Sequence, residues 1–131
     1  LVPITDALRQ SDLSRTRDSL ALISQGWSGG TRIGECLGSF NDDYGRLLNS
    51  RSLVIIVSDG LDTGEPERLA QELARIKGRC RKLIWLNPLL GRSGYEPRSQ
   101  GMQAALPQLD LFAPAHNLQS LKALEPVLIG L

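Results

Sequence analysis

The distribution of hydrophobic and polar residues predicts strands and helices that alternate along the chain. Residues 52–58 (SLVIIVS) contain five consecutive apolar positions, which is typical of a strand buried on both faces of a sheet. Residues 83–86 have the same character, and residues 109–113 form a third, weaker candidate strand. Residues 1–5 (LVPIT) are interpreted as the end of a further strand.

Helical periodicity fills most of the chain between these strands. Ser11 and Asp12 are good N-cap candidates for a first helix, and Gly26 ends it. Pro66 suits the first turn of a later helix, in which apolar residues recur every three or four positions. The predicted helices cover residues 13–24, 32–48, 66–77, 99–106 and 117–128.

This order predicts an α/β fold. Strands that alternate with helices form right-handed crossovers, so we expect a partial doubly wound, Rossmann-like parallel sheet with helices on both faces. Such folds bind ligands at the carboxyl ends of their strands. That rule points to Ser58-Asp59-Gly60, after the first predicted strand, and to Asn87, after the second.

Composition narrows the class of protein. The chain has 131 residues, 41% hydrophobic and 22% charged, which fits a single globular domain; because it begins with Leu1 instead of Met, we interpret it as truncated. The formal charge of +1 gives no general attraction to nucleic acid or anionic membranes, and no apolar run is long enough to span a bilayer. Cys36 and Cys80 are interpreted as buried or half-buried thiols in a reducing, cytoplasmic compartment.

Two oxygen-bearing side chains are candidate metal ligands. Asp59 directly follows the strongest predicted strand, where a carboxylate suits Mg²⁺ or Mn²⁺, although it could instead only cap the turn. Thr31, in SGGTRIGE, follows two glycines at a predicted helix start, where a hydroxyl and backbone N–H groups can face a metal or an anion. An ordinary N-cap is the alternative role of Thr31.

Taken together, these residues resemble part of the von Willebrand factor A (VWA) family. The metal-ion-dependent adhesion site of that family combines Asp-x-Ser-x-Ser after the first strand, a Thr at a helix start, and an Asp, often in Ser-Asp-Gly, after a later strand. Thr31 and Asp59 match the second and third parts. The chain is most similar to the CoxE-like branch, linked to carbon monoxide dehydrogenase gene clusters, through WSGGTRIGE, SDGLDTGEPERL, LIWLNPLLG, GYEP, GMQAALP and PAHNL.

The resemblance implies a protein-interaction module whose metal, Mg²⁺ or Mn²⁺, is held by Thr31 and Asp59. It also implies a MoxR-type AAA+ ATPase and a client metalloenzyme as partners, an accessory role in metalloenzyme maturation or assembly, and no catalysis by the chain itself. Four further residues are candidate partner contacts near the same edge: Trp27, Asp62, Asn87 and His116.

One part of the family pattern is missing. Residues 12–16 (DLSRT) have the form Asp-x-Ser-x-Thr, but no apolar strand precedes them, so we interpret them as a helix N-terminus. The chain therefore lacks the first strand and its ligands, and we expect weak metal affinity. A sheet without that strand exposes unpaired edges, which favour a homodimer.

An enzyme is the alternative hypothesis. A Mg²⁺-dependent phosphotransferase or hydrolase could use Asp59 as nucleophile and Asp62 as acid or base. Haloacid-dehalogenase-like enzymes place these carboxylates two residues apart, whereas the spacing here is three, which counts against this hypothesis.

Overall fold

The computed structural model describes residues 2–24 and 31–130, and only the backbone of residues 23 and 24. The chain divides into two compact units, Leu1–Gly30 and Thr31–Leu131. No helix among the described residues is long and apolar enough to cross a bilayer.

The first unit contains two helices, α1 (Thr5–Leu8) and α2 (Leu13–Ser24). Helix α2 has the predicted bounds. The Asp12 carboxylate accepts the backbone N–H of Ser14 at 2.9 Å, which confirms that residues 12–16 form a helix N-terminus. The strand predicted for residues 1–5 is wrong: Leu8 N–H donates to Ile4 O at 3.1 Å in the turn of α1. This turn satisfies the backbone locally, without a neighbouring strand.

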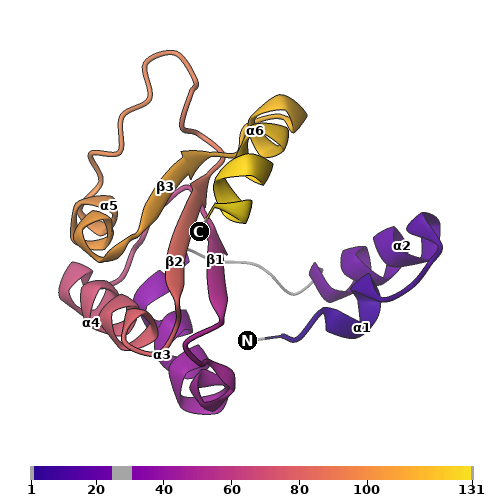
Figure 1. Cartoon of the computed structure of the whole chain (residues 1–131), viewed down its shortest axis with the longest axis horizontal. Helices are drawn as coiled ribbons and strands as arrows, with labels where there is room; N and C mark the ends of the chain where they lie inside the picture. Colours follow the sequence, from indigo (N-terminus) through magenta and orange to yellow (C-terminus); the bar gives the residue numbers. More distant parts are fainter. Residues whose placement is uncertain (1, 25–30, 131) are drawn as a thin grey trace. The chain divides into compact units, whose positions relative to one another are not determined.

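The second unit alternates helices and strands as predicted, with two short 3₁₀ helices. The elements are α3 (Ile33–Asp43), η1 (Gly45–Leu47), β1 (Leu53–Val57), α4 (Pro66–Lys77), β2 (Lys82–Asn87), α5 (Gln100–Ala105), η2 (Leu106–Gln108), β3 (Leu111–Pro114) and α6 (Leu118–Ile129). The three strands form a parallel sheet in the order β1-β2-β3 (Figure 1). Their register pairs Val57 with Leu86 and Asn87 with Pro114, so the three carboxyl ends share one edge.

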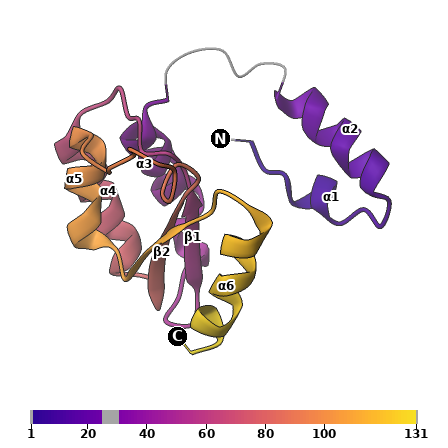
Figure 2. The ribbon, with the colours of Figure 1, turned by 90° about the horizontal axis from the view of Figure 1, so that it is seen from above.

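Helices cover both faces of this sheet. Helices α3, α4 and α5 lie on one face and α6 on the other (Figure 2). The larger core, under α4 and α5, includes the fully buried Leu69, Leu73 and Trp85. The smaller core joins α6 to β2 and β3 through Leu124, Ile84 and Ala113. The prediction of a partial doubly wound α/β fold is confirmed.

Strand β1 is not buried on both faces, which corrects the prediction for residues 52–58. Val54 and Ile56 pack against the larger core, but Leu53, Ile55 and Val57 are 43%, 45% and 66% exposed. Alternate residues of a strand point to opposite faces, and on the second face the α6 core involves β2 and β3 alone. Within the described residues β1 also pairs with one strand only, so it is an edge strand.

Two other predictions need correction. The helix predicted for residues 32–48 ends at Asp43, because Tyr44 leaves helical geometry with φ −122° and the next turn is η1. Cys36 is exposed, not buried, whereas Cys80 is half-buried as predicted. Burial raises the pKa of the Cys80 thiol, and the nearby Asp110 carboxylate adds to this effect.

Candidate functional site

The turn that follows β1 presents Asp59 at the carboxyl edge of the sheet. The Asp59 carboxylate is half-exposed and accepts the Leu61 N–H at 3.0 Å. Gly60 is buried with φ +75°, a conformation that favours glycine. A Cβ atom at Gly60 would lie 2.1 Å from Met102 Sδ, so any side chain here would displace Met102. Backbone conformation and packing therefore both require glycine directly after Asp59.

We call residues 58–60 the Asp59 turn. Side chains from outside this turn donate hydrogen bonds to its three backbone carbonyl groups. Trp85 Nε1 donates to Ser58 O (2.9 Å), Asn87 Nδ2 and the Tyr95 hydroxyl donate to Asp59 O (both 3.1 Å), and the Ser99 hydroxyl donates to Gly60 O (3.0 Å). These donors come from β2, from the connection after β2, and from the residue before α5. Hydrogen bonds from several elements fix the turn in one conformation, which is what a site needs if its ligand atoms are to be held in place.

Asn87 belongs to this support and does not face a partner, which corrects its prediction as a partner contact. Its side chain is fully buried. Nδ2 donates to Tyr95 Oη at 2.8 Å as well as to Asp59, while Oδ1 accepts the N–H groups of Leu89 (2.7 Å) and Leu90 (3.2 Å). The amide therefore uses both donors and both acceptor positions inside the protein.

The segment that carries Thr31 is joined to the chain that follows the Asp59 turn. The backbone N–H and the hydroxyl of Thr63 donate to Thr31 O at 3.1 and 3.2 Å. Asp62 Oδ1 accepts the N–H groups of Ile33 and Gly64, both at 2.9 Å. Thr31 itself is exposed and lies just before Arg32, the N-cap residue of α3, so it does not have the alternative role of an ordinary N-cap. The structure thus brings the two predicted metal-ligating residues onto adjoining, mutually bonded segments.

Asp62 has a positioning role. One carboxylate oxygen receives the first N–H of α3, which satisfies a donor that has no acceptor inside the helix. Its other oxygen, Oδ2, is buried and receives no hydrogen bond from the described residues. A carboxylate committed to two backbone N–H groups is poorly placed as an acid or base, so this arrangement counts against the phosphotransferase hypothesis.

His116 lies at the same edge, just beyond β3, where the Ala115 N–H donates to Asn87 O at 3.0 Å. Its exposed imidazole packs against Gly91, which has φ +95°; a Cβ there would lie 2.7 Å from His116 Cε1. His116 is therefore placed where a partner could touch it. Trp27, the fourth predicted contact, lies outside the described residues.

The chemistry of Thr31 and Asp59 suits Mg²⁺ or Mn²⁺, because both offer hard oxygen donors. Their number is small: among residues 2–24 and 31–130, no three His, Cys, Asp or Glu side chains group as a metal site. Mg²⁺ commonly binds through one or two carboxylates and keeps several waters. The two side chains are therefore of the kind that such an ion takes, and their role as metal ligands stays a prediction.

Sequence reasoning missed three of the donors to the Asp59 turn. The sequence pattern assigns no site role to Trp85 or Tyr95, and it places Ser99 only at the start of the helix predicted for residues 99–106. Ser99 does cap α5, since its Oγ accepts the Met102 N–H at 3.2 Å. A hydrogen bond to a carbonyl far away in the sequence leaves no local sequence pattern. The only signal in the sequence was that these polar side chains lie in or after the second predicted strand.

Comparison with known families gives one match. The model of a family described as "VWA domain containing CoxE-like protein" matches residues 1–121, which cover the first compact unit and most of the second. Comparisons with curated proteins and with solved structures give no match.

Proposed function

The chain belongs to the family of CoxE-like proteins that contain a VWA domain, and from this premise we propose that it is a metal-dependent protein-interaction module. The metal would be held at the carboxyl edge of the sheet by the Thr31 hydroxyl and the Asp59 carboxylate. When bound, Mg²⁺ or Mn²⁺ supplies a cation with open coordination positions, to which a carboxylate of a partner protein can bind.

The observation that carries this proposal is the support around the Asp59 turn. Four side chains donate to its three carbonyls, and Asp62 and Thr63 join the following segment to the Thr31 segment. A turn that only reversed the chain would not need this many donors from other elements. Fixed ligand atoms lower the entropic cost of binding a metal and its partner.

We propose an accessory role and not a catalytic one. The partners would be a MoxR-type AAA+ ATPase and a client metalloenzyme, with the chain helping the ATPase act on the client during maturation or assembly. The commitment of Asp62 to the start of α3 supports a binding role, because it leaves Asp59 without a second free carboxylate for acid–base chemistry.

The test is metal-dependent binding of the partner. A purified MoxR-type ATPase from the same organism is immobilised, and the binding of the full chain is measured by biolayer interferometry in Mg²⁺ and in EDTA. We expect EDTA to weaken binding about tenfold or more, and Asp59→Asn to cause the same loss in Mg²⁺. Asp43→Asn, which changes an exposed carboxylate at the last residue of α3, is the matched control and should bind normally.

Each failure has a separate meaning. Binding that is equally strong in EDTA would refute the metal-bridged contact while keeping the ATPase as partner. No binding in either buffer would refute the partner.

We also propose that the open edge of β1 supports a homodimer. Leu53, Ile55 and Val57 form an exposed apolar row on a strand that pairs on one side only among the described residues. Sedimentation equilibrium should therefore show concentration-dependent association. Ile55→Lys should shift the equilibrium to the monomer, whereas Leu118→Lys, an equally apolar exposed position on α6, should not. A monomer at all concentrations would refute the dimer.

A further inference from the structure

The opposite edge of the sheet, where the strands begin, carries a cluster of cations that the proposed function does not use. We call it the basic edge; it consists of Arg46, Arg51, Arg79, Arg81 and Lys82. Arg46 comes from η1 and Arg51 from the connection to β1, whereas the other three lie between α4 and β2 or at the first residue of β2. The Arg81 N–H donates to Ser52 O at 2.8 Å, and the Arg79 guanidinium packs on Gly45. The two parts of the chain are therefore adjacent in space.

The charge of the basic edge is not neutralised within the described part of the chain. None of its five side chains has a carboxylate within ion-pair distance among these residues. Neighbouring cations differ: Arg75 pairs with Asp42 at 2.9 Å, and Lys77 approaches Asp110 at 3.8 Å. The chain as a whole carries only +1, so this edge is a local excess of positive charge.

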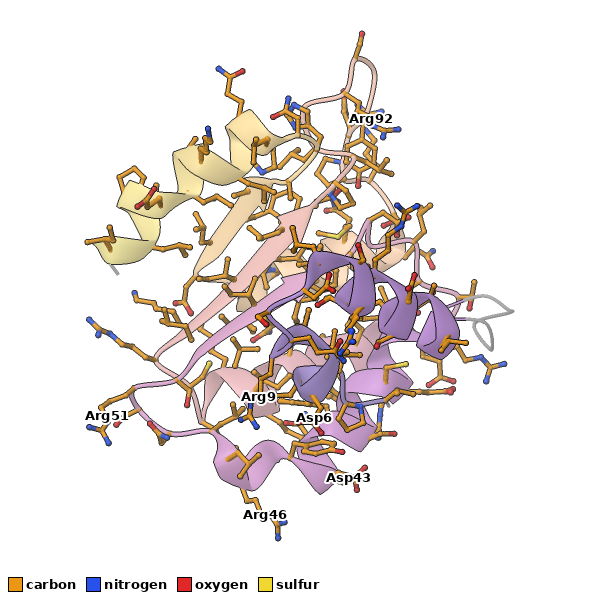
Figure 3. The ribbon with its side chains drawn as sticks, turned by 90° about the vertical axis from the view of Figure 1, so that its right-hand side faces the viewer. Asp6, Arg9, Asp43, Arg46, Arg51 and Arg92 are labelled. Carbon is orange, nitrogen blue, oxygen red and sulfur yellow. The ribbon has the colours of Figure 1, made fainter. Side chains whose placement is uncertain are left out.

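A cavity opens within the basic edge, between the ends of α3 and α4. Its volume is about 620 Å³, and its walls include Arg46, Arg79, Leu48 and the ion-paired Arg75 and Asp42. Arg75 is occupied by Asp42 and Glu72, whereas Arg46 and Arg79 have no anionic partner among the described residues. Figure 3 shows Arg46 and Arg51 extending outward at this end of the unit, with Arg92 at the far end. Two guanidinium groups at one cavity favour a carboxylate or phosphate ligand.

One residue that lines the cavity has an unsatisfied acceptor beneath the surface. Asn41 is 3% exposed and lines the cavity; its Nδ2 donates to Glu72 O and Oε2 at 3.0 and 2.8 Å. Its Oδ1 is buried and accepts no hydrogen bond from the described residues, 3.7 Å from the position a Cβ on Gly45 would occupy. The Arg79 guanidinium lies against Gly45 and donates to the backbone carbonyl of Asn41 at 3.5 Å, so Arg79 and this unpaired acceptor lie beside the same glycine.

We propose that the basic edge is a docking surface for an acidic segment of a partner protein. One Asp or Glu carboxylate of that segment binds between Arg46 and Arg79, and a peptide N–H beside it donates to Asn41 Oδ1. A peptide supplies both acceptors and donors, whereas a phosphodiester supplies acceptors only. The nearby aromatic rings of Phe40 and Tyr44 stack on each other, with centroids 6.1 Å apart, and neither is exposed for stacking on a base.

This inference is independent of the metal site, because the two lie at opposite edges of the sheet. Its test uses the full chain and a fluorescein-labelled octaglutamate peptide, followed by fluorescence anisotropy without metal. Arg46→Glu/Arg79→Glu should weaken peptide binding about tenfold or more. The matched control, Arg92→Glu/Arg98→Glu, makes the same change in net charge on the connection between β2 and α5 and should change affinity less than about twofold.

The alternative ligand is tested in the same assay. Oligothymidylate of equal charge should bind more weakly than the peptide and should not discriminate between the two double variants. The inference is overturned if the oligonucleotide binds more tightly than the peptide, if both double variants lose peptide binding equally, or if the wild-type chain does not bind the peptide. A second variant guards against misfolding caused by Arg79→Glu. Arg46→Gln/Arg51→Gln alters only exposed side chains, and we expect it to weaken peptide binding several-fold.

Discussion

Replacement of Asn87 by Leu should destabilise the second unit by removing the centre of the support under the Asp59 turn. Leu has a similar size but no polar atoms, so the change isolates the hydrogen bonds. Four are lost: two donated by Nδ2, to Asp59 O and Tyr95 Oη, and two accepted by Oδ1, from Leu89 and Leu90. The Asn87 side chain is fully buried, so water does not replace these hydrogen bonds in the variant.

The magnitude follows from which groups are left unpaired. Asp59 O keeps its bond from Tyr95, and Leu90 N–H keeps a backbone bond to Asn87 O at 3.3 Å. The Leu89 N–H loses its acceptor, and the leucine at position 87 donates no hydrogen bond to the Asp59 turn. A lost net hydrogen bond costs about 1 kcal/mol and an unpaired buried group about 1–3 kcal/mol, so we expect a loss of about 3 kcal/mol in the free energy of unfolding.

Urea denaturation of the full chain, followed by tryptophan fluorescence, measures this loss because Trp85 is buried in the core. Tyr95→Phe removes only the hydroxyl and should cost about 1 kcal/mol. The double variant should lose about 1 kcal/mol less than the sum, because Asn87 and Tyr95 share a bond. Gln119→Leu, an exposed amide on α6, is the control. A cost for Asn87→Leu no greater than that of the control would refute the role assigned to Asn87.

Three further predictions concern packing and thiol chemistry. Gly60→Ala should cost about 2 kcal/mol or more by urea denaturation, because it combines positive φ with a Cβ 2.1 Å from Met102 Sδ; a neutral effect would contradict the geometry of the turn. Gly34→Ala should cost about 1–3 kcal/mol, since its Cβ would lie 2.9 Å from the Leu69 backbone nitrogen and push α3 away from α4; Gly78→Ala, whose Cβ meets nothing closer than 3.5 Å, is the control. Iodoacetamide should alkylate exposed Cys36 well before Cys80 at neutral pH, as followed by peptide mass spectrometry. The raised pKa of Cys80 leaves less thiolate at neutral pH and slows its alkylation further; equal rates for the two thiols would contradict the burial.

The sequence predicted the fold class because the periodicities were strong. Helix α2 has the predicted bounds, and the parallel order of β1, β2 and β3 follows from their alternation with helices. The prediction that β1 is buried on both faces of the sheet was wrong. A run such as LVIIV is equally compatible with a central strand and with an edge strand that has one open face, and periodicity alone does not separate them. Leu53, Ile55 and Val57 are exposed for this reason.

The sequence pointed to Thr31 and Asp59 as candidate ligands, which stay predictions, but it did not reveal the hydrogen bonds that support the Asp59 turn. Asp59 and Thr31 stood out because strand ends and helix starts are recognisable in sequence. Tyr95, Ser99 and the indole N–H of Trp85 contribute through contacts with residues at least 27 positions away, and no local pattern encodes such contacts. Asn87 was placed at the correct edge but given the wrong role, because its burial depends on the connection that folds over it.

The central claim is that Thr31 and Asp59 together bind a divalent cation. The most direct measurement is a Mn²⁺ titration of the isotopically labelled full chain, with paramagnetic broadening of each backbone amide followed by NMR. We predict broadening centred on the Thr31 segment and the Asp59 turn, lost in Asp59→Ala and retained in Asp43→Ala. Uniform broadening, or none near Asp59 up to millimolar Mn²⁺, would contradict a metal site at this edge.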